Sequence, residues 1–278
     1  MNLPITLQQA LHHTIALGVD RLDAQLLVLH ALGRAPHDRA WLLTHDTDAL
    51  PPSAHTALHA AAQRRAGGEP LAYITGYKEF FGLNLAVDAR VLVPRPDTET
   101  LVEWTLAVLS TRPGARVVDL GTGSGAIALA LKATRGDLQV VAVDYSTDAL
   151  TVAQANAQRL GLNVQFQQGS WLNPVVGPFD AIVSNPPYIA AADHHLAALT
   201  HEPLQALASG ADGLDDIRTI IAHAPAHLRS SGWLLLEHGY DQADAVRAMM
   251  DQAGLQNVQS RRDLAGIERC SGGQRSTS

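Results

Sequence analysis

The chain has 278 residues, 46% of them hydrophobic and 17% charged, which is enough for one large domain or a catalytic domain with a small companion. Its formal net charge of −7 disfavours broad phosphate contacts with nucleic acid, and its single cysteine excludes a disulfide framework or a cysteine-cluster metal site. No segment is apolar over the length of a membrane span, and the N-terminus lacks a basic region followed by an apolar stretch, so we expect a cytoplasmic protein.

The first part of the chain is rich in alanine, leucine and histidine and shows helical spacing. Apolar residues between 22 and 32 recur on one helical face, and Gly33 follows as a stop. A further helix opens at Pro51 and ends at Gly67. We therefore predict a small helical domain over residues 1–75.

A short hairpin and a longer region of alternating elements follow. Residues 79–88 alternate around a glycine turn, which predicts a β-hairpin linker over residues 76–97. Over residues 98–278, helical and strand-like segments alternate, which indicates an α/β domain with a mostly parallel sheet covered on both faces. The expected strands are residues 116–120, 140–144, 164–168, 180–184 and 233–237, with a final hairpin within 258–270. The expected helices are residues 98–110, 125–134, 147–160, 213–230 and 241–253.

A glycine-rich turn joins the first strand of this domain to the next helix. Glycines there let the backbone approach a ligand closely. The spacing is not the G-x-G-x-x-G that seats a pyrophosphate, and no lysine follows to reach a phosphate. An aspartate just before the turn would repel a pyrophosphate and attract an ammonium group. The candidate cofactor residues of this segment are Asp119, Gly121, Thr122, Gly123, Ser124 and Gly125.

The second strand of the domain ends at Asp144, an acidic tip that suits the two hydroxyls of a ribose. A ligand with a ribose, a cationic amino acid end and no phosphate is S-adenosylmethionine. The glycine turn, the upstream Asp119 and the strand-tip Asp144 together predict a site for this cofactor. The alternative is a glycine turn that serves only the packing of a helix against a strand.

The tetrapeptide Asn185-Pro186-Pro187-Tyr188 ends the apolar strand at 180–184. Two prolines cannot continue a strand ladder, so the backbone turns and holds Asn185 at the carboxyl edge of the sheet, where open α/β folds bind ligands. The asparagine amide offers one acceptor and two donors, and the tyrosine offers an aromatic face. The motif predicts a clamp for a planar group that carries an NH2, and a rigid turn with a capping asparagine is the alternative.

Taken together, these features resemble a known family. The strand arrangement resembles that of the seven-stranded Rossmann-like methyltransferases that use S-adenosylmethionine, and Asn-Pro-Pro-Tyr is similar to the motif of amino and amide N-methyltransferases. Nearly the whole chain resembles the bacterial peptide chain release factor glutamine-N5 methyltransferases, the PrmC or HemK family. Beside the two motifs, the segments that carry this resemblance are residues 21–24, 68–76, 93–99, 202–203, 206–207, 213–214 and 234–239.

The resemblance implies methyl transfer from S-adenosylmethionine to the side-chain amide nitrogen (N5) of the glutamine in the Gly-Gly-Gln motif of class-I peptide chain release factors. It also implies an N-terminal helical domain that docks the release factor, with no membrane contact and no direct nucleic-acid binding. No metal is expected.

The resemblance also assigns roles by matching position. Asn185 and Tyr188 would be catalytic, and the substrate glutamine would be held by Asn185, Pro186, Pro187 and Tyr188. The cofactor would be bound by residues 121–125 with Asp119, Asp144, Trp171 and Asn185. Arg95 and Glu99 would line the cofactor entrance.

Some segments depart from the family pattern. Ser170 stands where the family often has an acidic residue before the tryptophan, so we expect retained but weaker cofactor binding. The loop at 193–201 is slightly shorter than its family counterpart. The tail contains Gly-Gly-Gln at 272–274, the substrate motif itself, which we interpret as chance within a polar tail. The adjacent His194 and His195 lack metal-ligand spacing, and we expect them to point apart on a helix.

Other functions compete with this interpretation. An adenine-N6 DNA methyltransferase resembles the chain in the same tetrapeptide, but the acidic charge balance and the small helical domain disfavour it. A ribosomal-protein glutamine methyltransferase is a near neighbour that the N-terminal segment disfavours. A cofactor-binding protein without turnover is a third interpretation, against which the intact Asn185 and Tyr188 argue.

Overall fold

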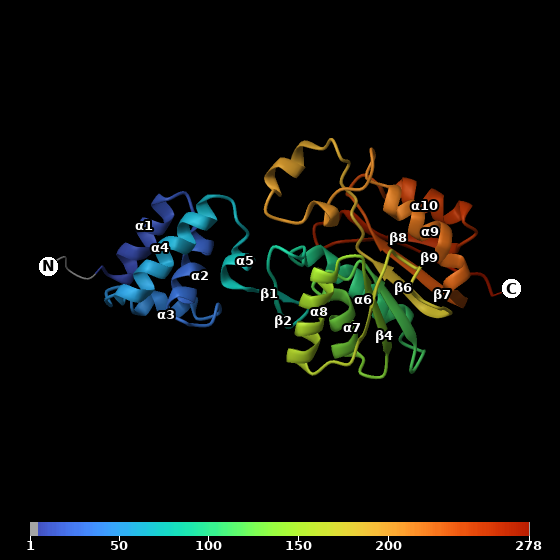
Figure 1. Ribbon diagram of the computed structural model, residues 1–278, viewed down its shortest axis with the longest axis horizontal. Coiled ribbons are helices and arrows are strands. Elements are labelled where there is room, and N and C mark those ends of the chain that lie inside the picture. The colour runs from blue at the N-terminus through green and yellow to red at the C-terminus, as the bar shows by residue number, and fades with distance from the viewer. Residues whose placement is uncertain (1–4, 278) are drawn as a thin grey trace. The chain divides into compact units, whose positions relative to one another are not determined.

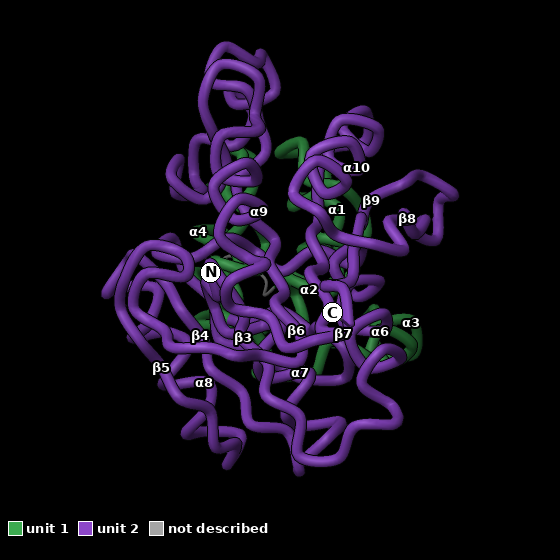
Figure 2. The backbone as a smooth tube through the Cα atoms, turned by 90° about the vertical axis from the view of Figure 1, so that its right-hand side faces the viewer, with its two compact units in different colours: residues 1–76 green, residues 77–278 purple. Residues whose placement is uncertain are grey.

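The computed structural model describes residues 5–277, and the chain divides into two compact units that meet between Gly76 and Tyr77 (Figure 2). The hairpin expected as a linker belongs to the second unit. In the described part of the chain, no helix combines the length and apolar character that a membrane span requires.

The first unit is a small helical domain. Its first helix begins with a capping box, in which the side chains of Thr6 and Gln9 each accept a hydrogen bond from the other residue's backbone N–H. Leu27, Val28 and Leu29 are fully buried in its apolar core. The helices are α1 (Leu7–Ala16), α2 (Arg21–Ala31), α3 (Arg39–Thr44), α4 (Pro52–Ala66) and α5 (Leu71–Thr75).

The hairpin of β1 (Tyr77–Phe80) and β2 (Leu83–Ala86) packs into the second unit. Phe80 and Leu85 belong to that unit's apolar core because alternate residues of a strand point to the same face. The buried side chain of Asn156 accepts a hydrogen bond from Ala86 N at 2.8 Å and donates to Ala86 O at 2.9 Å and to Ser124 O at 3.0 Å. One side-chain amide therefore ties the hairpin to the glycine turn.

A seven-stranded sheet in the order β5-β4-β3-β6-β7-β9-β8 forms the centre of the second unit (Figure 1). Five strands are parallel, and the last two, β8 and β9, form the antiparallel end of the sheet. The strands are β3 (Arg116–Leu120), β4 (Gln139–Asp144), β5 (Gln165–Gln168), β6 (Phe179–Ser184), β7 (Leu228–Glu237), β8 (Gln256–Arg262) and β9 (Glu268–Gln274). The α/β architecture with a helical N-terminal domain is confirmed.

Helices cover both faces of this sheet (Figure 1). Along β3, Val117 packs into the apolar cluster under α6, α7 and α8, whereas Val118 packs into the cluster under α9 and α10. This alternation follows from the two-residue period of a strand, so each central strand is apolar on both sides. The helices are α6 (Glu99–Val108), α7 (Ala126–Thr134), α8 (Thr147–Leu160), α9 (Asp215–His227) and α10 (Ala243–Gln252).

Short 3-10 turns complete the connections. They are η1 (Pro96–Thr98), η2 (His194–Ala198) and η3 (Leu204–Ala206). The segment that contains η2 and η3 joins β6 to α9, and a parallel bridge between Ile189 and Ala208 brings its two ends together.

The C-terminal hairpin is longer than expected and is not a polar tail. Gly272 lies in β9, and a Cβ built on it would meet Leu235 Cδ2 at 2.5 Å and Trp104 at 2.9 Å, so close packing accounts for a glycine there. Gln274 pairs with Trp233, at the opposite end of the β7–β9 ladder from Glu237.

The carboxyl ends of the parallel strands meet at one edge. Leu120 of β3 lies beside Val143 of β4 on one side and Ser184 of β6 on the other, and Ser184 lies beside Leu236 of β7. The chain runs outward from β3 through β4 to β5 and then returns to β6, so the strand order reverses at β3. Such a reversal opens a crevice where α/β sheets bind ligands.

Candidate cofactor pocket and amide clamp

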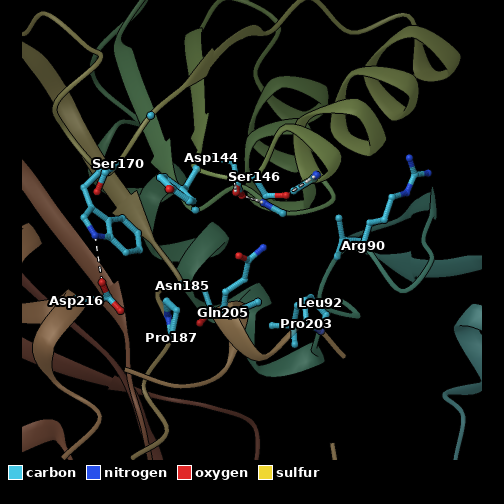
Figure 3. Close-up of a pocket in the computed structure, with 18 residues that line it drawn as sticks. Arg90, Leu92, Asp144, Ser146, Ser170, Asn185, Pro187, Pro203, Gln205 and Asp216 are labelled. Atoms are coloured by element: carbon cyan, nitrogen blue, oxygen red, sulfur yellow. Dashed lines mark hydrogen bonds between the residues drawn. The ribbon is translucent and has the colours of Figure 1, made fainter. Parts of the chain in front are cut away.

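A pocket of about 250 Å³ lies at this sheet edge (Figure 3). It is built from the ends of the four parallel strands β3, β4, β5 and β6, the segment before η1 and the segment around η3. Its lining residues include Gly121, Gly123, Asp144, Trp171, Asn185 and Pro187 from the sequence predictions. The lining residues that sequence reasoning did not single out include Arg90, Leu92, Tyr145, Ser146, Pro203, Gln205 and Asp216.

The glycine turn folds back against β4. The backbone N–H groups of Gly121 and Thr122 both donate to Val143 O at 2.9 Å. Gly121 has a φ of +70°, and a Cβ there would come within 3.3 Å of the Trp171 ring. Gly125, at a φ of +85°, approaches Leu129 instead, which makes it a helix-packing glycine rather than a lining residue.

Two other residues of the turn face the protein interior. Thr122 Oγ1 donates to Asp119 Oδ2 at 2.6 Å, and Ser124 is buried with its carbonyl bonded to Asn156. Neither Thr122 nor Ser124 lines the pocket. The predicted turn is therefore divided between pocket surface and internal support.

Asp119 is fully buried beneath the turn. Its Oδ2 accepts hydrogen bonds from Thr122 and from Ala128 N, whereas Oδ1 has no hydrogen-bond partner within residues 5–277. Burial raises the pKa of Asp119 to about 7, against the opposing effect of the Thr122 hydrogen bond. An unpaired carboxylate oxygen at this depth favours a cationic partner.

Asp144 lines the pocket at the tip of β4. Its two oxygens accept from Gly123 N at 2.8 Å and from Ser146 N at 2.9 Å. Burial raises its pKa above the ordinary value, and these backbone bonds oppose that shift. Each oxygen keeps a further lone pair for a ligand hydroxyl.

Trp171 lines the pocket. Its indole Nε1 donates to Asp216 Oδ1 at 3.2 Å, which fixes the ring against the first turn of α9. Ser170 is exposed and also lines the pocket. An acidic side chain is thus present beside Trp171, supplied by α9 and not by position 170.

Asn185 and Pro187 of the tetrapeptide lie near Asp216, and Arg90 lies on the far side of the pocket (Figure 3). Asn185 Nδ2 donates to Thr98 Oγ1 at 3.2 Å, and Pro187 lines the pocket while Pro186 is buried. Within residues 5–277, neither Asn185 Oδ1 nor the Pro186 carbonyl accepts a hydrogen bond. Both acceptors of the clamp are therefore without a partner in the described part of the chain.

Tyr188 does not line the pocket and turns toward β7. Its hydroxyl donates to Glu237 Oε1 at 3.4 Å, and its carbonyl accepts from Gln242 Nε2 at 3.0 Å. Gly213 packs on its backbone so closely that a Cβ would lie 2.2 Å from Tyr188 O. Burial raises the pKa of Tyr188, so its hydroxyl stays protonated.

Arg95 and Glu99 have other partners and do not line the pocket. Arg95 pairs with the buried carboxylate of Glu202 at 2.5 Å, and Glu202 also accepts from Val93 N at 3.1 Å. Glu99 accepts from Phe81 N at 3.0 Å. These contacts fasten the segment before α6 to the segment after β6 and to the hairpin.

His194 and His195 lie side by side, contrary to the expectation that they point apart. Their ring centroids are 4.0 Å apart, because η2 is a short 3-10 turn capped by Asp193. His195 Nδ1 lies 2.7 Å and His194 Nδ1 3.5 Å from Asp193 Oδ1. Both rings are exposed and lie outside the pocket.

Sequence reasoning assigned no role to Thr98, Asp216 or Glu237. The signal for Glu237 was present, since it ends an apolar strand as Asp144 does. Thr98 lies in the segment 93–99 that carries the family resemblance, and Asp216 lies in a polar stretch with no motif of its own; only tertiary structure brings either residue to the site.

Comparison with known proteins follows the same division of the chain. The family model described as the PrmC N-terminal domain matches residues 7–76, and the one described as the methyltransferase small domain matches residues 98–210. A methyltransferase structure from Pyrococcus furiosus has a TM-score of 0.54 at 20% identity, covers 70% of this chain and 90% of its own, and supports the fold.

Two curated relatives are similar over nearly the whole length. Proteins from Bordetella pertussis and Xylella fastidiosa, both named release factor glutamine methyltransferase, are 50% and 48% identical to this chain over 260 residues. The matched region covers 92% of this chain and 95% and 94% of these relatives. The chain therefore belongs to the release factor glutamine methyltransferase family.

Proposed function

We propose that this protein transfers the methyl group of S-adenosylmethionine to the N5 side-chain nitrogen of the glutamine in the Gly-Gly-Gln motif of class-I release factors. The names of its relatives support the reaction and the substrate. The observation that carries the proposal is the pair of free acceptors, Asn185 Oδ1 and Pro186 O, beside a pocket built from the glycine turn.

The pocket residues fit the proposed cofactor. Asp119 does not line the pocket, but its buried, unpaired Oδ1 beneath the glycine turn would favour the cofactor's ammonium group, and Asp144, which does line the pocket, keeps lone pairs for ribose hydroxyls. The Trp171 ring offers an apolar face for the adenine, and the missing side chain of Gly121 leaves the space beside that ring open. When bound, the cofactor supplies a methyl group already activated by a sulfonium charge.

The clamp residues supply orientation and electrostatic stabilisation. An amide nitrogen is a poor nucleophile because its lone pair is delocalised into the carbonyl. Asn185 Oδ1 and Pro186 O would each accept one N–H of the glutamine amide. These bonds strengthen as the nitrogen rehybridises and gains positive charge, so they stabilise the transition state more than the bound substrate. Alignment of the nitrogen with the methyl group contributes up to roughly 7–11 kcal/mol in well-oriented systems.

We also infer that the helical unit helps to dock the release factor, since its match is to the PrmC N-terminal domain. The protein would then act in the cytoplasm, where translation termination takes place.

Incubation with labelled S-adenosylmethionine and a purified class-I release factor tests the proposal. We expect label on the wild-type release factor and none on a matched release factor whose loop glutamine is changed to alanine. Equal label on both substrates would contradict the glutamine assignment.

A further inference from the structure

Thr98 and Glu237 lie behind the clamp, and neither is among the residues that line the pocket. Glu237 is 1% exposed and Thr98 is 4% exposed. They come from β7 and from η1, elements that contribute no residue to the clamp sequence. A buried carboxyl at this place costs folding free energy, so its presence beside the clamp calls for a compensating role.

The sheet register brings Glu237 to the clamp. Ser184 of β6 lies beside Leu236 of β7 in a parallel ladder, so the next residues, Asn185 and Glu237, end the two strands side by side. The Tyr188 hydroxyl returns to Glu237 Oε1 at 3.4 Å. Glu237 therefore faces both ends of the tetrapeptide.

Hydrogen bonds run through this group in one direction. Asn185 Nδ2 donates to Thr98 Oγ1 at 3.2 Å. The Thr98 hydroxyl has a single proton, and its hydrogen bond with Glu237 lowers the pKa of that carboxyl against the larger, raising effect of burial. Above about pH 7, where Glu237 has lost its proton, its carboxylate only accepts, so the threonine proton goes to Glu237 and the threonine lone pair receives the asparagine N–H.

This direction determines which way the Asn185 amide faces. An asparagine side chain can rotate by half a turn and exchange its oxygen with its nitrogen, and only its partners select one state. With Nδ2 committed to Thr98, the oxygen is left as the free acceptor described above. The opposite state would present an NH2 group to the NH2 group of the substrate, a pairing without an acceptor.

We propose that Thr98 and Glu237 are positioning residues for methyl transfer: they commit the Asn185 nitrogen to the protein interior and leave its oxygen for the substrate amide. The inference rests on the proposed function, since it gives the acceptor oxygen its use. The two residues act through Asn185 and Tyr188 and are not placed in contact with substrate or cofactor.

Three variants test the inference on turnover. Thr98→Val keeps the shape and removes the hydroxyl, so we expect kcat to fall at least tenfold, with the KM for the release factor and the Kd for S-adenosylhomocysteine within threefold of wild type. Thr98→Ser restores the hydroxyl and is expected to recover most of kcat. Thr105→Val is the matched control, because Thr105 is fully buried in α6 and its hydroxyl donates to Leu101 O, away from the clamp.

A double-variant cycle separates positioning from general damage. Glu237→Leu leaves the threonine proton without its acceptor, so we expect a loss of kcat similar to that of Thr98→Val. If the two residues act as one unit, the double variant is no worse than either single variant. Losses that multiply, or equal losses in Thr98→Val and Thr105→Val, would overturn the inference.

A measurement that does not depend on enzymatic activity tests the positioning role even if the protein does not methylate release factors. The Asn185 side-chain NH2 signals in 15N NMR, assigned by their loss in Asn185→Asp, should exchange slowly with water in the wild type and in Thr98→Ser. They should exchange at least tenfold faster in Thr98→Val. An inactive wild-type enzyme would reject the proposed function, whereas equal exchange in wild type and Thr98→Val would reject the positioning role.

Discussion

Two acidic residues end strands β4 and β7 at the same edge of the sheet, with β3 and β6 between them, and they differ in their surroundings. Asp144 at the tip of β4 lines the pocket, whereas Glu237 at the tip of β7 is covered by its neighbours and points to other side chains. Each follows an apolar strand. An acidic residue at a strand end that lines the pocket, such as Asp144, is a candidate ligand for the cofactor. A buried one, such as Glu237, instead holds the side chains beside it in place.

The largest expected effect is a loss of kcat when the clamp residue Asn185, which lies near the covered acid Glu237, is changed. Asn185→Ala removes the acceptor oxygen, and loss of one such group typically lowers kcat by about 10²–10³-fold. Because the cofactor side keeps its contacts, we expect the Kd for S-adenosylhomocysteine to change by less than roughly tenfold, or about 1.4 kcal/mol. Labelled methyl transfer and calorimetry measure the two quantities, and near-normal turnover would refute the clamp.

The pH dependence of the unfolding free energy tests whether Glu237 is buried at a cost to stability when it is ionised. Burial raises the pKa of Glu237 to about 7 from an ordinary 4.5, so between these values the folded protein holds a proton that the unfolded chain has released. Its stabilising contribution is complete below about pH 4.5 and is lost as the pH rises through 7. We expect Glu237→Gln to remove this loss, which amounts to a few kcal/mol at about 1.36 kcal/mol per pKa unit.

Urea unfolding of the ligand-free proteins at pH 5 and pH 8 measures this dependence. The difference in unfolding free energy between wild type and Glu237→Gln should shift in favour of glutamine at the higher pH. Glu103→Gln, on the exposed face of α6, is the control and should show no such shift. Parallel behaviour of Glu237→Gln and its control would contradict the description of Glu237 as a buried, costly acid.

A smaller effect is expected for Asp144, the strand-tip acid that lines the pocket. Asp144→Ala removes the acceptors of Gly123 N and Ser146 N together with the proposed ribose contact. We expect about a 10- to 100-fold weaker Kd for S-adenosylhomocysteine, from hydrogen bonds to a charged group worth about 1.5–3 kcal/mol. At saturating cofactor, kcat should stay within threefold of wild type. A large loss of kcat under saturation would place Asp144 in the same class as Asn185.

We expect no methylation of Gln274, the glutamine of the chain's own Gly-Gly-Gln sequence in β9. Gln274 pairs in β9, donates to Ser231 O at 3.0 Å and accepts from Asn257 Nδ2 at 2.9 Å, so its amide is committed to the sheet. Intact mass after incubation with the methyl donor should show no added methyl group. A gain that disappears in Gln274→Ala would show that the tail leaves the sheet and reaches the clamp.

The sequence predicted the order of helices and strands because period-two and helical patterns are local. It placed the start of β7 at residue 233, whereas the strand begins at Leu228. Ser231 has a φ of +60° and the register to β6 shifts between Phe179 and Ala181, so this irregular start carries no regular alternation.

The candidate site was predictable only where a motif marks it. Gly121, Gly123 and Asp144 line the pocket because the turn and the strand tip are set by local backbone geometry. The division of roles within the turn was not predictable, since Thr122 faces inward and donates to Asp119 beneath the turn. The pairing of Trp171 with Asp216 depends on α9 packing against the sheet, which no short motif encodes.

Asn156 has a consequence for solubility. Its side-chain amide donates to and accepts from the backbone of Ala86 as a residue of a neighbouring strand would. The open edge of β2 is thereby occupied at its last residue by a side chain of the same molecule. A two-stranded hairpin with free edges can pair with a strand of another chain. The buried amide of Asn156 blocks such pairing at Ala86, the last residue of β2.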